Sequence, residues 1–282
     1  MPNPAKKSLG QNFLVERSYQ ERIVGALTPG PDDVVLEIGP GRGALTRHLL
    51  GRVRRLVLVE LDDALAAQWQ NETAGRADVE VRHQDALTLD LRTIGGSPEH
   101  LKVIGNIPYH ITSPLLFRLL EPDRRAALIV LMVQREVASR MLAPAGGHEY
   151  GALTIGVQTA ARCERLFQVP RGAFRPVPNV DSTVVRLTPW RPPLLDRAEA
   201  QHLRTLTRAA FGWRRKQLQR ILRDAPAYGL NAPQLAELTA AGFEPTARPE
   251  ALSPDEFIRL TRELRRLGFP RQDTAQPGTS WD

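Results

Sequence analysis

Four residues recur at nearly equal intervals along the chain, each at the end of a short apolar run. They are Gly39, Glu60, Asp85 and Asn106, separated by 21, 25 and 21 positions. The apolar runs are typical of buried strands. One strand and one helix together take about that many residues, so we expect the four positions to meet at the carboxyl edge of a parallel sheet. Ligands bind at this edge in open α/β folds.

A glycine-rich turn follows the first of these runs. Residues 39–43 read Gly-Pro-Gly-Arg-Gly, between a strand-like segment, 32–38, and a helix-like segment, 44–50. Because glycine lets the backbone approach a ligand closely, Gly39 and Gly41 are candidate cofactor-binding residues. The spacing differs from the G-x-G-x-x-G of dinucleotide-binding folds, and there is no phosphate-loop motif. This departure weighs against a nicotinamide-dependent oxidoreductase, an alternative with a similar sheet.

Two carboxylates end the next two predicted strands. Glu60 is placed to accept hydrogen bonds from both hydroxyls of a ribose, and Asp85 to accept one from an adenine amine. A carboxylate at the end of a strand is often only a capping or solvated group. Polar ends in phase with a glycine turn favour a nucleoside ligand instead.

The fourth run ends in Asn106-Ile107-Pro108-Tyr109, a pattern suited to methylating the exocyclic amine of adenine. The N6 lone pair is delocalised into the ring and is a poor nucleophile. The Asn106 side-chain oxygen and the Ile107 carbonyl can accept the two N–H bonds and localise that pair. Pro108 stiffens the turn, and Tyr109 can stack on a base drawn out of its helix. The alternative is a strand that runs into a proline turn, with a tyrosine of the core.

A second aromatic lies beside a proline-rich segment. Residues 174–180 read Phe-Arg-Pro-Val-Pro-Asn-Val, and the two prolines predict an exposed, stiff loop. Phe174 can present a flat face to a base from such a loop. The alternative is a ring packed beneath its own loop.

On these motifs the chain resembles the ribosomal RNA adenine dimethyltransferases, in particular the type that acts on small-subunit ribosomal RNA. The resemblance extends from Lys7 to about Leu267 and includes two long, unusual segments, 9–14 and 173–182. It implies an α/β fold, a Rossmann-like class I S-adenosylmethionine-dependent methyltransferase domain with a smaller all-helical C-terminal domain. It also implies that Phe174 stacks on the target adenine opposite Tyr109. The residues that it implies for the S-adenosylmethionine site are Asn12, Leu14, Gly39, Gly41, Glu60, Asp85, Ala86 and Asn106.

The resemblance further implies a reaction and a partner. The reaction is dimethylation of N6 on two adjacent adenosines in the 3′-terminal hairpin loop of small-subunit ribosomal RNA, within a pre-ribosomal small subunit and by a monomer. One alternative is a large-subunit methyltransferase of the macrolide-resistance type, which shares the cofactor motifs. Another is a non-catalytic ribosome-assembly or transcription factor on the same fold. Segments 174–182 and 210–216 favour the small-subunit enzyme.

The charge of the chain agrees with a polyanionic partner. The formal net charge is +7, and residues 191–282 hold 15 Lys and Arg against 11 Asp and Glu. A helix predicted over 203–222 has Lys216, Arg220 and Arg223 opposite its apolar stripe, with Arg214 and Arg215 beside the stripe. We expect these five residues to bind RNA phosphates. The alternative is a merely solvated helix face.

Proline- and glycine-rich breaks and the pattern of apolar residues predict the domain boundaries. We expect a methyltransferase domain over 1–190, a helical RNA-recognition domain over 191–269 with helices at 232–241 and 254–267, and a disordered tail over 270–282. The longest apolar run has eight residues, far below the ~20 of a membrane span. The N-terminal residues lead into no export signal, and the single cysteine suits a reducing compartment, so we expect a cytoplasmic protein. The six histidines lack metal-ligand spacing, and we expect no metal.

Overall fold

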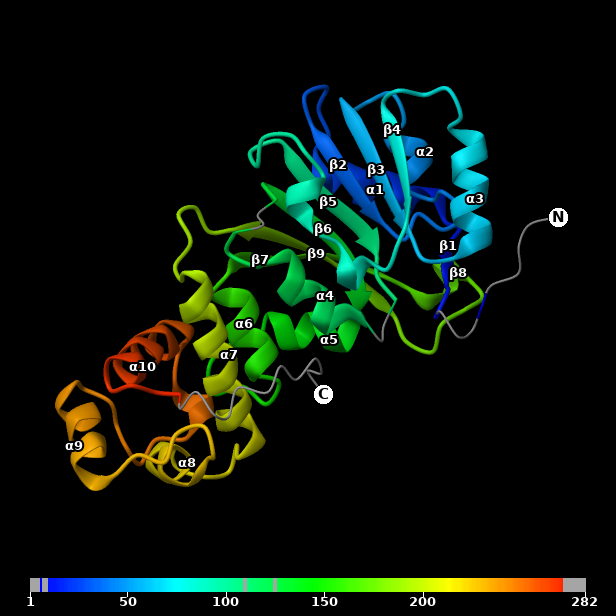
Figure 1. The fold of residues 1–282 in the computed structure, drawn as a ribbon. Helices are drawn as coiled ribbons and strands as arrows, with labels where there is room; N and C mark the ends of the chain where they lie inside the picture. The colour runs from blue at the N-terminus through cyan, green and yellow to red at the C-terminus, as the bar shows by residue number, and fades with distance from the viewer. Residues whose placement is uncertain (1–5, 7–9, 109–110, 124–125, 271–282) are drawn as a thin grey trace. The chain divides into compact units, whose positions relative to one another are not determined.

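A computed structural model describes residues 6, 10–108, 111–123 and 126–270. The chain forms two compact units (Figure 1). Of the described residues, the first unit contains those up to 120 together with 126–138 and 162–189, and the second contains 121–123, 139–161 and 190–270. Each unit has its own hydrophobic core.

A seven-stranded sheet organises the first unit. Its strand order is β4-β3-β2-β5-β6-β9-β7. The first five of these strands are parallel, and β9 runs antiparallel to β6. The strands are β2 (Val34–Ile38), β3 (Arg55–Glu60), β4 (Val79–His83), β5 (Leu101–Asn106), β6 (Leu128–Gln134), β7 (Ala161–Val169) and β9 (Ser182–Pro189).

The parallel register brings the predicted strand ends together. Ile38 of β2 is aligned with Val59 of β3 and with Gly105 of β5, so the residues that follow each strand emerge at one edge. β4 joins the same edge, because its His83 is aligned with Glu60. The four strands predicted from the sequence, and their common carboxyl edge, are confirmed.

One face of the sheet packs against helices. The helices are α1 (Arg17–Leu27), α2 (Thr46–Leu49) and α3 (Asp63–Glu72). Ile23 and Leu27 of α1 share a core with Val35 of β2, Ile104 of β5 and Val130 of β6. Leu56 and Leu58 of β3 belong to the same core, as the two-residue period of a strand requires. In Figure 1, α1 lies behind the sheet and α4 (Thr112–Leu119) in front of it.

A short two-stranded sheet adds the N-terminal segment to this unit. β1 (Phe13–Leu14) pairs antiparallel with β8 (Phe174–Arg175), with Leu14 aligned to Phe174. The Val15 N–H also donates to the Ala173 carbonyl at 2.9 Å. The pairing therefore fixes the segment just before α1.

The second unit is helical and is larger than the predicted domain over 191–269. Its core contains Tyr150 and Ile155 together with residues of the later helices, so segment 139–161 packs with the C-terminal residues and not with the sheet core. Its helices are α6 (Ala152–Gln158), α7 (Arg197–Gly212), α8 (Leu218–Asp224), α9 (Ala232–Ala240) and α10 (Pro254–Arg266), and α5 (Arg135–Met141) precedes them. The predicted helices 232–241 and 254–267 are confirmed, and the tail predicted over 270–282 lies outside the described residues apart from Pro270.

The helix predicted over 203–222 is wrong in one respect, because it is two helices. α7 ends at Gly212 and α8 begins at Leu218. Between them the Lys216 N–H donates to the Trp213 carbonyl at 2.8 Å, which closes a turn. Glycine is a poor helix former, and this local turn replaces the helical hydrogen bonds beyond it. In the described parts of the chain, none of the helices combines the length and apolar character needed to cross a bilayer.

Candidate active site

A cavity of about 640 Å³ opens at the carboxyl edge of the sheet in the first unit. Its wall contains every residue that the sequence assigned to a cofactor: Asn12, Leu14, Gly39, Gly41, Glu60, Asp85, Ala86 and Asn106. Ile107 and Pro108 line it as well. Tyr109 lies outside the described residues. Residues far apart in the sequence therefore meet at one place.

The glycine turn is held against the N-terminal segment. Gly41 has a φ of +54°, which favours glycine, and a side chain there would bring its Cβ to 3.1 Å from the Phe13 ring. The Arg42 guanidinium lies 4.3 Å from the centre of the same ring. The Gly41 N–H donates to Glu60 Oε2 at 3.0 Å. The turn is thus fixed from both sides of the cavity.

Glu60 is a buried carboxylate that accepts three backbone hydrogen bonds. Besides the bond from Gly41, its Oε1 accepts from the N–H groups of Leu61 at 2.9 Å and Asp62 at 3.0 Å. Glu60 is only 6% exposed, and burial raises the pKa of its carboxyl group. A carboxylate has about four acceptor positions. This arrangement leaves roughly one of them for a ribose hydroxyl, where the sequence suggested two.

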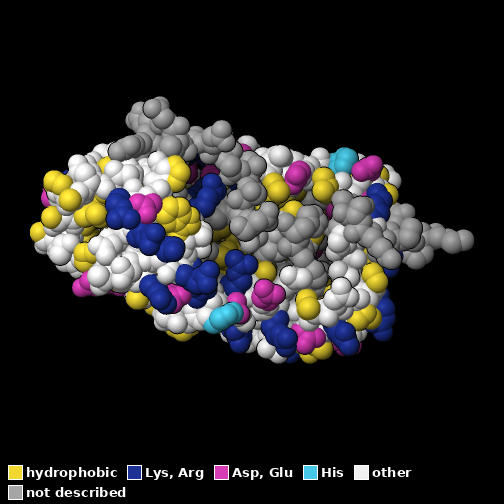
Figure 2. All heavy atoms as spheres, turned by 90° about the horizontal axis from the view of Figure 1, so that it is seen from below, with side chains coloured by type: hydrophobic (Ala, Val, Ile, Leu, Met, Phe, Trp, Pro, Cys, Tyr) yellow, Lys and Arg dark blue, Asp and Glu magenta, His cyan; other side chains and the backbone are white. Residues whose placement is uncertain are grey.

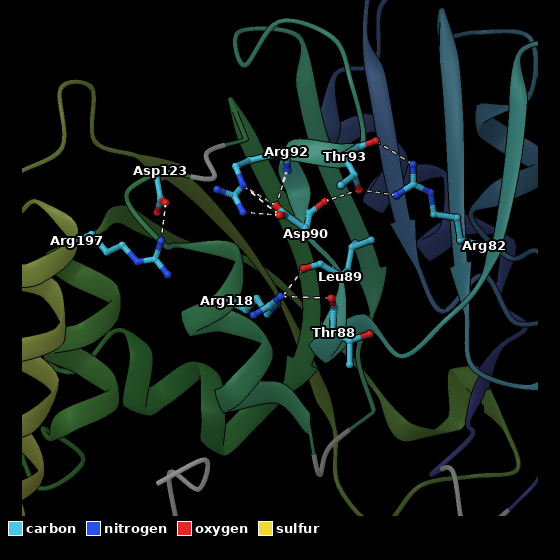
Figure 3. A network of polar contacts seen from close by, with 9 residues as sticks. All are labelled: Arg82, Thr88, Leu89, Asp90, Arg92, Thr93, Arg118, Asp123 and Arg197. Atoms are coloured by element: carbon cyan, nitrogen blue, oxygen red, sulfur yellow. Dashed lines mark hydrogen bonds and ion pairs between the residues drawn. The ribbon is translucent and has the colours of Figure 1, made fainter. Parts of the chain in front are cut away.

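Asp85 caps the segment that follows it and still lines the cavity. Its Oδ1 accepts from the Leu87 N–H at 2.8 Å, at the start of a 3₁₀ helix (Ala86–Thr88). Arg118 of α4 donates to the Leu89 carbonyl at 2.9 Å and holds this segment from the other side (Figure 3). The capping role and the ligand role coexist, because Oδ2 receives no hydrogen bond from any described residue.

Asn106 is anchored through one atom of its amide. Its Nδ2 donates to the Asn12 carbonyl at 3.0 Å, and no described residue donates to Oδ1. The preceding Gly105 allows this close arrangement, since a Cβ there would lie 2.7 Å from the Ile38 carbonyl oxygen. The Ile107 N–H donates to the Met132 carbonyl at 3.1 Å, and within the described ranges no donor reaches the Ile107 carbonyl. Two acceptors, Oδ1 and the Ile107 oxygen, thus belong to neighbouring residues of the cavity wall.

The sequence reasoning missed other residues of the cavity wall, among them Glu37 and Leu61. Glu37 is 1% exposed, its Oε2 has no partner among the described residues, and burial raises its pKa to about 8. Leu61, which is 47% exposed, offers the cavity an apolar surface. The available signal was position alone: Glu37 lies two residues before Gly39, and Leu61 directly follows Glu60.

The expectation for Phe174 is corrected by its burial. The ring is 1% exposed and belongs to the sheet core together with Leu14. It does not line the cavity. Pairing of β8 with β1 turns this ring inward, whereas Val177 of the following loop is 51% exposed. The ring is therefore packed in the core of the first unit, which disagrees with an aromatic face exposed on the loop.

The five basic residues predicted to bind RNA lie in the second unit and have different surroundings. Arg214, Arg215 and Lys216 belong to the turn after α7, and Arg220 and Arg223 lie on α8. Arg220 and Arg223 share Asp224, at 3.6 and 2.6 Å. Among the described residues no group of His, Cys, Asp and Glu side chains is arranged to hold a metal ion.

The fold and the cavity together define a class I methyltransferase. The features that define it are a mostly parallel sheet, a glycine turn after β2, a carboxylate at the end of β3 and another after β4. The chain belongs to the ribosomal RNA adenine dimethylase family, whose sequence model matches residues 3–259. The fold class and the family predicted from the sequence are confirmed.

Known relatives match nearly the whole chain. The ribosomal RNA small subunit methyltransferase A of Geobacter metallireducens is 42% identical over 269 residues, which cover 94% of this chain and 97% of the relative. The protein of the same name from Nitrosococcus oceani is 41% identical over 92% of this chain and 95% of its own length. This chain is therefore an enzyme of the adenine dimethyltransferase type.

Two solved structures share the fold. A dimethyladenosine transferase from Plasmodium falciparum has a TM-score of 0.78 and 27% identity, covering 91% of this chain and 98% of that one. The 23S rRNA methyltransferase ErmE has a TM-score of 0.65 and 30% identity, covering 90% and 100%. A 23S rRNA methyltransferase is thus a related branch, while the two relatives described above, at 42% and 41% identity, are small-subunit methyltransferases.

Proposed function

We propose that this chain transfers methyl groups from S-adenosylmethionine to N6 of two adjacent adenosines in the 3′-terminal hairpin loop of small-subunit ribosomal RNA. The substrate is a pre-ribosomal small subunit in the cytoplasm, and the enzyme acts as a monomer. The observation that carries the proposal is the Asn106 amide, anchored through Nδ2 with Oδ1 left as an acceptor on the cavity wall.

The residues of the cavity suit a nucleoside with a charged side chain. Glu60 retains an acceptor position for a ribose hydroxyl, and Asp85 retains Oδ2 for an adenine amine. Leu61 supplies an apolar surface for a purine ring. When bound, S-adenosylmethionine supplies a methyl group on a sulfonium, which is already an excellent leaving group. The chain therefore has no need of a covalent nucleophile, and its task is to orient the acceptor amine.

The Asn106 clamp polarises the acceptor amine. Oδ1 and the Ile107 carbonyl accept the two N6 hydrogens, which draws the lone pair out of conjugation with the ring and directs it at the methyl group. The hydrogen bond from Nδ2 to Asn12 fixes which amide atom faces the base. Pro108 limits the motion of the next peptide unit. These groups act by position, and that is the main source of rate enhancement for a reaction with an activated donor.

The second methyl transfer sets a steric requirement. After the first transfer N6 carries one hydrogen, so only one of the two acceptors remains occupied and the first methyl has to rotate aside. The proton released after each attack passes to water. The target adenine has to leave its stack to reach the clamp. Tyr109 is the residue proposed to hold one face of the base, and we give Phe174 no such role, because its ring is in the core.

The test is to incubate small subunits that lack the modification with the protein and labelled S-adenosylmethionine, and then to map the modified bases. We expect N6,N6-dimethyladenosine at two adjacent positions of the terminal loop. Already methylated subunits are the control and should take up no label. Label in large subunits instead would support the macrolide-resistance alternative. RNA binding without incorporation would support the non-catalytic alternative.

A further inference from the structure

The turn between α7 and α8 displays an aromatic ring among cations. Trp213 directly follows the last residue of α7, and the turn closes through the hydrogen bond from the Lys216 N–H to the Trp213 carbonyl at 2.8 Å. Trp213 is 39% exposed and is the one aromatic residue among the large, exposed hydrophobic residues of the described part of the chain. Exposure of so much apolar ring surface to water is unfavourable unless a partner covers it.

Arg214 anchors this turn. Its Nε donates to Glu250 at 2.7 Å, and its two terminal nitrogens donate to the carbonyls of His148 at 2.8 Å and Gly147 at 3.1 Å. All three nitrogens of the guanidinium are engaged within the second unit. Arg214 therefore fixes the backbone of the turn, and we assign it to positioning and not to the phosphate contact expected from the sequence.

The two residues after Arg214 have exposed side chains, in contrast to the engaged guanidinium of Arg214. Arg215 and Lys216 are exposed, and neither has an acidic partner among the described residues. Together with Trp213 and Arg220 they line a hollow of about 420 Å³. Figure 2 looks from the side on which α8 lies in Figure 1, and Lys and Arg side chains gather in the left part of that face beside hydrophobic ones.

We propose that Trp213 stacks on an unpaired base of the RNA substrate while Arg215 and Lys216 bind the phosphates on either side of that base. A ring that lines the same hollow as two cations without an acidic partner among the described residues combines the two elements of single-strand recognition, a stacking platform and a charged groove. Because the turn is fixed by Arg214 before RNA arrives, little ordering is needed on binding. The inference rests on the proposed function only for the identity of the polyanion as RNA.

Binding of two probes separates stacking from charge. The probes are a short single-stranded RNA oligonucleotide and inorganic polyphosphate, which carries similar charge but no bases. We expect Trp213→Ala to weaken RNA binding roughly 5- to 100-fold and to leave polyphosphate binding and the salt dependence of RNA binding unchanged. Trp213→Phe should retain most of the RNA affinity. Leu194→Ala, another exposed hydrophobic side chain of the second unit, is the matched control.

The cations should behave in the complementary way. Arg215→Ala and Lys216→Ala should weaken binding of both probes, and each should lower the slope of log affinity against log salt by about 0.7. Arg266→Ala removes one positive charge at the end of α10 and controls for net charge. Thermal unfolding of each variant reports whether the second unit stays folded.

Equal RNA affinity of Trp213→Ala and the wild type would overturn the stacking role, and so would an equal loss for RNA and polyphosphate. If Trp213→Ala is unstable, the same comparison is made with Trp213→Leu, which keeps an apolar side chain without a stacking face. If only the stacking proposal is wrong, the wild-type protein still methylates small subunits. A wild type that neither binds RNA nor methylates subunits overturns both this inference and the proposed function.

Discussion

Three carboxylates around one cavity show how surroundings decide what a residue can do. Glu60 accepts three backbone hydrogen bonds, Asp85 accepts one, and Glu37 Oε2 accepts none from described residues. The pKa of Glu37 is accordingly raised by burial to about 8, so at neutral pH its carboxyl group is mostly protonated. The same chemical group thus serves as a scaffold, a cap or a buried acid.

The buried Glu37 predicts a pH dependence of stability. Its pKa is near 4.5 when exposed and about 8 in the folded chain, so between these values the folded state holds a proton that the unfolded state has lost. The free energy of unfolding therefore falls as the pH rises through that window. Glu37→Gln removes this contribution, and its stability relative to the wild type should grow by about 1.4 kcal/mol per pH unit. Urea unfolding at several pH values measures this difference, and a constant difference from pH 5 to 8 would refute the raised pKa.

The buried ring of Phe174 predicts a loss of stability on truncation. Phe174→Ala should lower the free energy of unfolding by about 3–5 kcal/mol, because it leaves a cavity in the sheet core. Phe174→Leu should cost less and keep methyl transfer per folded molecule. Denaturant unfolding and a methyl-transfer assay on the same samples test this. An alanine variant of full stability with lost turnover would instead favour the stacking role.

Single residues were predictable from the sequence where strand phase fixed them. Glu60, Asp85 and Asn106 follow strands of one parallel sheet, so the topology placed all three at one edge. The burial of Phe174 was not predictable in this way. It depends on the antiparallel pairing of β1 with β8, two strands of two residues each, in which the paired residues Leu14 and Phe174 are 160 positions apart. No local sequence pattern reports such a pairing.

At the scale of elements, the N-terminal segment is a strap that connects the two halves of the cavity. Gln11 donates to Asp62 at 3.0 Å, and Lys6 forms an ion pair with the same carboxylate at 3.1 Å. The carbonyl of Asn12, which follows Gln11, accepts a hydrogen bond from the Asn106 side-chain amide. Asp62 also caps α3 through the Ala64 N–H at 3.0 Å. The strap therefore ties the start of α3 to the orientation of the Asn106 amide.

Loosening the strap should be visible without a substrate. Gln11→Ala removes one hydrogen bond to a carboxylate, worth about 1.5–3 kcal/mol, while Asp62 still caps α3. Amide hydrogen exchange over residues 10–14 should become roughly 10- to 100-fold faster, and global stability should change little. Gln68→Ala, a substitution on α3 at a residue that does not line the cavity, is the control. Unchanged exchange over 10–14 would show that the β1–β8 pairing alone holds the strap.

Elements with a strong local pattern were predicted well, and those set by tertiary contacts were not. Strand β2 is a continuous run of buried residues, and helix α10 has a helical apolar period and a capping serine, Ser253. The turn between α7 and α8 is held by Arg214, which donates to the carbonyls of Gly147 and His148, more than sixty positions earlier. The helical period continues across the break, so the pattern alone favoured one helix.

At the scale of the whole molecule, charge and fold give consistent indications. The net charge of +7 belongs to a chain whose family acts on ribosomal RNA, and several of its exposed cations lie on and beside α8. Charge alone does not identify the RNA or the base that is modified. The match of relatives over more than nine-tenths of the chain extends the assignment to both units.

Reversal of charge should act on RNA binding as a whole. Substituting Glu for Lys216, Arg220 and Arg223 together should weaken RNA binding and lower the salt slope by about 2, because three fewer phosphates are neutralised. Asp224 loses its partners in the triple variant, so thermal unfolding is measured alongside. Binding measured at several salt concentrations gives the slope. An unchanged affinity at low salt would reduce this surface to a solvated helix face.

The most direct test of the account is the separation of donor binding from turnover at Asn106. Asn106→Ala should bind S-adenosylmethionine with an affinity within about 3-fold of the wild type, measured by calorimetry, while methyl transfer to small subunits falls roughly 100-fold. Asn71→Ala, an exposed asparagine of α3, should change neither. Equal losses of binding and turnover in Asn106→Ala, or full turnover, would contradict the amide clamp.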